Sequence, residues 1–232
     1  MAGTCVCDGV GLKDAIRQDM DRYVASAERD GRRRVFALIG VSLSFKVWAV
    51  ANHRLHHLLL MRRPRVLGGP LALVPFVAQL VLKAVTGIEI DGGAHIGPGL
   101  MITHDGNIVI GPVRIGRNCV ISQGVTLGQG LVGDGPAGAD TPVIGDRVWL
   151  GPGAVIAGPI VVGSDAAVGA NSVALRDVPA RGVVLGVPAR VVSHKGSFAQ
   201  VYYRGMDEDP ERLEALAAAA AIPEANPGPA AP

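Results

Sequence analysis

His104 is the residue whose type and position are best suited to chemistry. It stands in a polar segment, residues 103–107, that interrupts an otherwise regular repeat, so its ring is expected to leave the core. Imidazole titrates near neutral pH and can accept a proton from a hydroxyl group. Glu89 lies fifteen residues earlier, close to one predicted coil of three six-residue repeats, and could fix the tautomer of the ring. Spacing alone fits an ordinary surface histidine equally well.

Other histidines are weaker candidates for a chemical site. His53 and His57 are four residues apart, which is metal-ligand spacing on a helix, but no third ligand lies nearby. A γ-class carbonic anhydrase would need a histidine zinc site, and the repeat region holds only His95 and His104. We therefore predict no metal cofactor.

A six-residue repeat organises the second half of the chain. Every sixth residue is aliphatic, at Ile144, Leu150, Ile156, Val162, Val168 and Ala174. Neither the helical period nor simple strand alternation fits this pattern. A six-residue period is typical of a solenoid, in which short strands meet at corners and each coil packs on the next. The same phase returns upstream at Ile90, Ile96, Ile102, Ile115, Ile121 and Leu127. We predict one parallel β-helix over residues 88–192.

Two irregularities interrupt the repeat. One extra residue falls in the segment around His104, and eleven fall in a glycine-rich stretch over about residues 129–141. We predict that the longer insertion is a projecting loop. Residues 133–138 formally match G-x-G-x-x-G, but the motif opens no helix and belongs to no βαβ unit, so a dinucleotide site is not expected.

Charge divides the chain into two halves. Residues 1–84 hold 13 lysines and arginines against 6 acids, and the remainder holds 9 against 14. A basic half can attract nucleic acid or anionic lipid, but no nucleic-acid-binding motif accompanies it, and a solvated helix surface is the commoner outcome. We predict no nucleic-acid partner and no membrane association, although the basic, apolar N-terminal half would permit docking on a membrane. Three cysteines cannot form a closed disulfide framework, so a cytoplasmic location is expected.

Helical segments flank the repeat. Three are predicted on the N-terminal side, over residues 12–30, 35–60 and 71–84, with a turn at 64–70. Asp209 is expected to cap a short helix from Pro210 to about Ala221, followed by a Pro- and Ala-rich tail that has no means of packing. The predicted fold class is mainly β. Its parts are an N-terminal helical region (1–84), the β-helix domain (85–195) and a C-terminal helix with a tail (196–232).

Four segments together resemble the serine acetyltransferase branch of the hexapeptide-repeat acyltransferases. They are Gly99-Leu-Met-Ile-Thr-His104, Ile108-Val-Ile-Gly111, Gln123-Gly-Val-Thr-Leu-Gly128 and Gly186-Val-Pro-Ala-Arg190. The match covers residues 85–196 well and the preceding helices loosely. The resemblance implies a left-handed β-helix, a homotrimer or a dimer of trimers, and acetyl-coenzyme A bound in the groove between neighbouring subunits.

The resemblance also implies roles for individual residues. The histidine that matches His104 is the general base, and the acidic residue that matches Glu89, usually aspartate, orients it. The acceptor hydroxyl then attacks the thioester carbonyl of acetyl-coenzyme A. Backbone amides at the base of the loop hold the cofactor or the oxyanion. The implied cofactor-binding positions are Gly128, Gln129, Gly130, Gly151, Pro152, Ala170, Arg190 and Lys195.

The acceptor side departs from the family pattern. The family usually has aspartate before the catalytic histidine, where this chain has Thr103. It also has Arg-His before the proline that ends the loop, where this chain has Asp140 and Thr141. A serine carboxylate therefore loses its expected cationic partner. We predict an acetyl-coenzyme A-dependent O-acetyltransferase of the serine type. The alternatives are a sugar or another small hydroxyl compound as acceptor, and a non-catalytic scaffold subunit.

Overall fold

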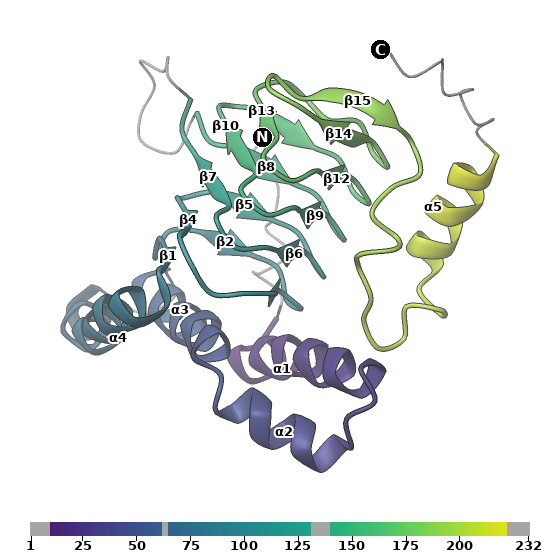
Figure 1. The fold of residues 1–232 in the computed structure, drawn as a ribbon. Coiled ribbons are helices and arrows are strands. Elements are labelled where there is room, and N and C mark those ends of the chain that lie inside the picture. The colour runs from purple at the N-terminus through teal and green to yellow at the C-terminus, as the bar shows by residue number, and fades with distance from the viewer. Residues whose placement is uncertain (1–9, 62–64, 131–139, 222–232) are drawn as a thin grey trace.

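The computed structural model describes residues 10–61, 65–130 and 140–221. Its centre is a parallel β-solenoid of short strands with N-terminal helices at one end and a short C-terminal helix on its flank (Figure 1). The predicted mainly β fold class is confirmed. The G-x-G-x-x-G match and the Pro- and Ala-rich tail lie outside the described residues.

The strands follow one another around three faces of the solenoid, which we call sheets A, B and C. Sheet A contains β1 (Ile88–Ile90), β4 (Ile108–Ile110), β7 (Thr126–Gly128), β10 (Val155–Ala157) and β13 (Val173–Ala174). Sheet B contains β2 (His95–Ile96), β5 (Arg114–Ile115), β8 (Val143–Ile144) and β11 (Val161–Val162). Sheet C contains β3 (Met101–Ile102), β6 (Val120–Ile121), β9 (Trp149–Leu150), β12 (Ala167–Val168), β14 (Val183–Leu185) and β15 (Arg190–Ser193).

The last strand departs from the predicted parallel solenoid. β15 pairs antiparallel with β14, with Leu185 opposite Arg190 and Val184 opposite Val191. The predicted parallel repeat to residue 192 is therefore wrong over its final strand. A short turn after Leu185 reverses the chain, and a reversed strand next to its predecessor can only pair antiparallel.

The predicted aliphatic positions form the core of the solenoid. Leu150, Ile156 and Val168 are 0% exposed, and each lies above its counterpart in the neighbouring coil. The small residue that follows each aliphatic position has a steric cause. A Cβ atom on Gly163 would lie 2.4 Å from the backbone nitrogen of Ala180 in the next coil, and one on Gly145 would lie 2.6 Å from that of Ser164. The small residues of the repeat are therefore required by the close packing of neighbouring coils.

Four helices precede the solenoid, and Figure 1 shows them at the end that holds β1 and β2. They are α1 (Leu12–Arg29), α2 (Arg34–Ser42), α3 (Phe45–Met61) and α4 (Arg65–Thr86). The predicted first helix is confirmed. The predicted single helix over 35–60 is wrong, because the chain breaks after Ser42 and α2 and α3 are bent by 64°. The indole nitrogen of Trp48 donates to the carbonyl of Ser42 at 2.9 Å, which satisfies a backbone group that the break exposes.

The start of α4 also differs from the prediction. Residues 64–70 were expected to form a turn because of their prolines and glycines, but the helix begins at Arg65 and passes through Pro70 and Pro75. Packing against α3 outweighs the local signal. Asn52 of α3 donates hydrogen bonds to the carbonyl of Pro75 at 2.9 Å and to the side chain of Gln79 at 3.4 Å.

A buried ion pair joins the helices to the solenoid. Arg54 of α3 donates to both carboxylate oxygens of Asp19 of α1, at 3.0 and 3.1 Å, and to the carbonyls of Ile96 and Gly97. Asp19 in turn accepts from the backbone nitrogens of Gly99 and Leu100, at 2.8 and 2.9 Å. Every charge in this cluster has partners, which a buried ion pair requires. The cluster fixes α1 and α3 against the first coil.

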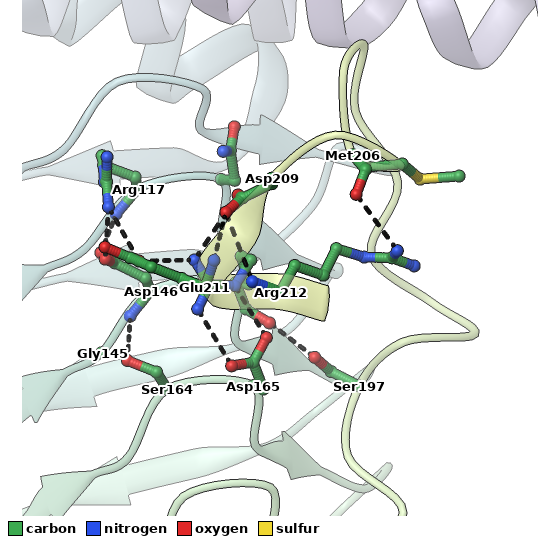
Figure 2. Close-up of polar contacts among 12 residues, drawn as sticks. Arg117, Gly145, Asp146, Ser164, Asp165, Ser197, Met206, Asp209, Glu211 and Arg212 are labelled. Atoms are coloured by element: carbon green, nitrogen blue, oxygen red, sulfur yellow. Dashed lines mark hydrogen bonds and ion pairs between the residues drawn. The ribbon is translucent and has the colours of Figure 1, made fainter. Parts of the chain in front are cut away.

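The C-terminal helix α5 (Pro210–Ala220) is capped by Asp209 as predicted. The Asp209 carboxylate accepts from the backbone nitrogens of Glu211 and Arg212. The helix is held by Glu211, which accepts from Arg117 and from Arg147, both at 3.1 Å. Figure 2 shows Glu211 beside Arg117. Arg147 also binds the buried carboxylate of Asp165 at 2.8 and 3.0 Å.

No single helix among the described residues is long and apolar enough to cross a membrane, although α2 and α3 together, as a bent pair, have the length and composition. Several apolar side chains of α4, among them Leu71, Val74 and Leu80, are exposed. Nothing in the described chain covers this face.

Candidate functional site

His104 lies at the corner where the chain passes from β3 of sheet C to β4 of sheet A. The extra residue in this coil is accommodated by Gly106 and Asn107, whose φ angles of 116° and 49° lie in the left-handed region. The His104 side chain is exposed, as predicted, and forms no hydrogen bond with the described residues. The insertion therefore turns the imidazole out of the stack.

A pocket of about 540 Å³ opens in front of His104. Helices α1, α2 and α3, the end of β3 and a segment after β15 all contribute to its walls. Besides Thr103 and His104, the polar side chains in these walls are those of Tyr23, Ser26, Asp30, Arg32, Ser44, Lys46 and Tyr202. Sequence reasoning missed all seven, because nothing in the sequence indicated which of these residues face the first coil.

Lys46 is linked to the residue before His104. Its ammonium group donates a hydrogen bond to the backbone carbonyl of Thr103. Burial lowers the pKa of Lys46, and the charge of Asp105 opposes that effect. The hydroxyl oxygen of Thr103 is buried without a hydrogen-bond partner among the described residues, while its backbone nitrogen donates to Ile121 at 3.0 Å. The backbone of Thr103, directly before His104, is therefore held by α3 on one side and by β6 on the other.

Glu89 and His104 do not bind each other in this structure. The carboxylate of Glu89, which faces outward from β1, lies 2.7 Å from the Lys83 ammonium of α4. The two coils nevertheless touch at this corner, since a Cβ atom on Gly87 would lie 2.8 Å from the backbone nitrogen of Asn107. The predicted orienting role of Glu89 therefore stays a prediction.

Three of the predicted cofactor-binding residues share an edge of the solenoid with His104. Gly151 and Pro152 follow β9 and Ala170 follows β12, and both strands belong to sheet C, as β3 does. Gly151 and Ala170 are stacked, because a Cβ atom on Gly151 would lie 2.8 Å from the Ala170 nitrogen. The Asn171 nitrogen donates to the carbonyl of Pro152 at 2.8 Å. The structure thus places His104 and these three residues along the corners between sheets C and A.

The other predicted cofactor-binding residues lie elsewhere on the chain. Gly128 ends β7, and Gln129 and Gly130 follow it, at the edge between sheets A and B. Arg190 lies exposed on β15, and the backbone nitrogen of Lys195 donates to the Ser193 hydroxyl at 3.1 Å. A single chain therefore does not bring the loop base to His104.

Asp140 and Thr141, at the end of the insertion, also lie away from the His104 pocket. The Thr141 hydroxyl donates to the carbonyl of Pro112 at 3.3 Å, so it binds the solenoid backbone. One carboxylate oxygen of Asp140 is buried without a partner among the described residues. Neither residue lines the pocket in this chain. Within the described part of the chain, no group of three or more His, Cys, Asp and Glu residues could hold a metal ion.

Two repeat families match the solenoid. Residues 141–174 match the bacterial transferase hexapeptide (six repeats), and residues 106–129 match the hexapeptide repeat of succinyl-transferase. The serine acetyltransferase of Mycobacterium tuberculosis is 40% identical to the chain over 148 residues, which are 63% of this chain and 60% of that protein. The chain thus spans about 60% of the length of several relatives that it matches.

Solved structures agree with these matches. The serine acetyltransferase of Brucella abortus has a TM-score of 0.66 and 28% identity, over 79% of this chain and 69% of its own. A serine acetyltransferase in complex with CoA has a TM-score of 0.64 and 30% identity, over 78% and 69%. The soybean enzyme complexed with serine has a TM-score of 0.63 and 34% identity, over 77% and 70%.

One relative matches over most of both sequences. The serine acetyltransferase of Bacillus licheniformis is 35% identical over 186 residues, which are 78% of this chain and 78% of that protein. This match extends well beyond the repeat that defines the wider hexapeptide group. The chain therefore belongs to the serine acetyltransferase family.

Proposed function

We propose that the chain transfers an acetyl group from acetyl-coenzyme A to the hydroxyl group of serine, with His104 as general base. The observation that carries the proposal is the exposed imidazole of His104 in a pocket at the corner of the solenoid. Relatives of this chain have been solved in complex with CoA and with serine, which supports the same pair of substrates here.

The reaction needs one proton acceptor that later becomes a proton donor. The neutral His104 ring takes the proton of the acceptor hydroxyl while the oxygen attacks the thioester carbonyl carbon. A tetrahedral oxyanion forms, and the backbone amides of residues 128–130 are candidates to stabilise it. When the carbon–sulfur bond breaks, the imidazolium returns the proton to the leaving thiolate. The products are an acetyl ester and free coenzyme A.

A groove between subunits would complete the site. His104, Gly151, Pro152 and Ala170 lie along the corners between sheets C and A, whereas residues 128–130 lie between sheets A and B. The edge of one chain must therefore face the other edge of a neighbour if both are to contact one cofactor. A homotrimer provides this contact three times. Sedimentation analysis should show a particle of three chains of 23.9 kDa, or of six if two trimers pair.

The test is a thiol-release assay of acetyl-coenzyme A against L-serine, homoserine, sugars and nucleotide sugars. We expect turnover with L-serine, and a loss of about 100- to 10,000-fold in kcat in the His104→Ala variant, the usual contribution of a general base. Calorimetry should show that His104→Ala still binds acetyl-coenzyme A. The control is His56→Ala, which removes an imidazole of α3 outside the pocket.

The other results of the same assay have definite meanings. Turnover only with sugars would make a sugar the acceptor and leave the general-base role intact. An absence of both turnover and acetyl-coenzyme A binding in the wild-type protein would indicate a scaffold subunit. A His104→Ala variant that works at the wild-type rate would contradict the assignment of the base.

A further inference from the structure

The acceptor proposed above carries a carboxylate, and the expected cations for it are missing. Asp140 and Thr141 occupy the positions of the usual Arg-His pair, and neither lines the His104 pocket in this chain. A carboxylate in a partly enclosed pocket needs a cation or several hydrogen-bond donors, because desolvation of an unpaired charge is costly. The pocket must therefore obtain its positive charge from another element.

Two cationic side chains line the pocket, and their settings differ. Arg32 lies in the exposed connection between α1 and α2 and forms no hydrogen bond or ion pair with the described residues. Lys46 lies near the start of α3, is half-buried, and donates to the carbonyl of Thr103. Thr103 is the residue immediately before His104. The Lys46 ammonium is therefore held at a defined place relative to the proposed base.

The ammonium group of Lys46 retains donors for a ligand. It has three N–H groups, and the carbonyl of Thr103 is its one hydrogen-bond acceptor among the described residues. Its nitrogen also lies 5.8 Å from the centre of the Tyr23 ring, whose face attracts a cation. Tyr23 is itself fixed, because its hydroxyl accepts from the backbone nitrogen of Ile102 at 2.8 Å.

We infer that Lys46 binds the carboxylate of the acceptor and thereby selects a hydroxy acid such as L-serine over a neutral sugar. The inference rests on the proposed function and adds the acceptor-binding residue to it. Lys46 replaces the lost loop cations with a cation from the helical region. In this arrangement the acceptor hydroxyl lies on the His104 side of the pocket and its carboxylate on the α3 side.

The experiment compares L-serine with L-serinamide, which keeps the hydroxyl and the amine but lacks the carboxylate. A hydrogen bond to a charged group is typically worth about 10- to 150-fold in affinity. Lys46→Met should therefore raise the KM for L-serine by about that factor with little change in kcat, and leave the kinetics with L-serinamide unchanged. Lys46→Arg should restore part of the affinity. Lys13→Met, which removes an exposed lysine of α1 outside the pocket, is the matched control.

The comparison separates carboxylate binding from a structural effect. Because Lys46 also holds the carbonyl of Thr103, its loss could displace His104, but that displacement would impair both acceptors alike. An equal loss with L-serine and L-serinamide would overturn the inference, and so would an unchanged KM for L-serine.

A binding measurement distinguishes this inference from the proposed function. Calorimetric titration of L-serine into His104→Ala, with and without Lys46→Met, measures how much Lys46 contributes to serine affinity in the absence of turnover. Serine binding that is lost with Lys46 supports the inference even if acetyl transfer is absent. Acetyl transfer to serine with unchanged binding in Lys46→Met would overturn the inference and leave the proposed function in place.

Discussion

The carboxylate of Glu89 lies 2.7 Å from the ammonium of Lys83, and both side chains are about half exposed, at 46% and 50%. The ion pair crosses from β1 to α4 and occupies the carboxylate that is predicted to orient His104. Exposed ion pairs of this kind contribute at most about 1 kcal/mol, so the carboxylate can exchange partners at little cost.

The first prediction concerns the partner of Glu89 during catalysis. Glu89→Gln should lower kcat by between about tenfold and 10,000-fold, the range found when a carboxylate that orients a histidine is neutralised. Lys83→Met should retain the wild-type rate or exceed it, because it frees the same carboxylate. Thiol release with saturating L-serine measures both. Equal losses in the two variants would mean that the Glu89–Lys83 pair, and not a Glu89–His104 pair, supports activity.

The second prediction concerns the attachment of α5. The side chains of Arg147 and Asp165 are only 6% and 4% exposed, and Arg147 also binds Glu211 of α5. Burial lowers the pKa of Arg147, but hydrogen bonds and charge from Asp165, with a further hydrogen bond from Glu211, outweigh it and raise that pKa. Arg147→Met leaves Asp165 buried without its cation, so the free energy of unfolding should fall by about 3–5 kcal/mol.

Arg117→Met is the control for Arg147, because Arg117 binds the same Glu211, and also Asp146, through a side chain that is 42% exposed, so its loss should cost only about 1 kcal/mol. Denaturant unfolding measures both variants. The double variant Arg147→Met/Asp165→Asn should recover part of the loss, since it removes the buried unpaired charge. If Arg147→Met and Arg117→Met were equally mild, the buried pair would not hold this part of the fold.

The third prediction concerns stability at mildly acidic pH. His53 is 2% exposed, and its pKa lies well below 6.5, first because of burial and then because of the charges of Arg54, His57 and His56. The unfolded chain binds a proton near pH 6.5, whereas the folded chain resists it. The titration of His53 therefore leaves the free energy of unfolding unchanged above that pH and lowers it as the pH falls below it. Between pH 7.5 and 5.5 the loss from this one group should reach about 1.4 kcal/mol.

His53→Leu isolates this effect, because leucine does not titrate. Denaturant unfolding at a series of pH values should show a smaller fall in stability for the variant than for the wild-type protein, by about 1.4 kcal/mol over the same interval. Two parallel curves would show that His53 does not resist protonation in the folded state.

The solenoid and the corner that carries His104 could be predicted from the six-residue pattern of the sequence. Positions such as Leu150 and Gly163 are constrained by contact with the neighbouring coil. The same residue types therefore recur with the same period in each coil. The extra residue beside His104 was visible as a break in that period, and the exposed ring follows from it. Asp209 was also recognisable as a cap, because its partners, the backbone nitrogens of Glu211 and Arg212, lie only two and three residues later.

The contacts between the helices and the first coil could not be read in this way. Lys46 and Thr103 are separated by 57 residues, and their hydrogen bond depends on how α3 docks on the solenoid. The pairing of Glu89 with Lys83 depends on the course of α4, whose start at Arg65 contradicted the local proline and glycine signal. Docking is decided by buried partners such as Asp19 and Arg54, which have no short-range signature.

The sequence by itself therefore determined the solenoid, its register and the corner at which an imidazole leaves the core, because those features repeat over short distances along the chain. Only the tertiary structure decided what surrounds that imidazole. The walls of the His104 pocket come from helices far away in the sequence, and their side chains meet it through packing that no local period encodes.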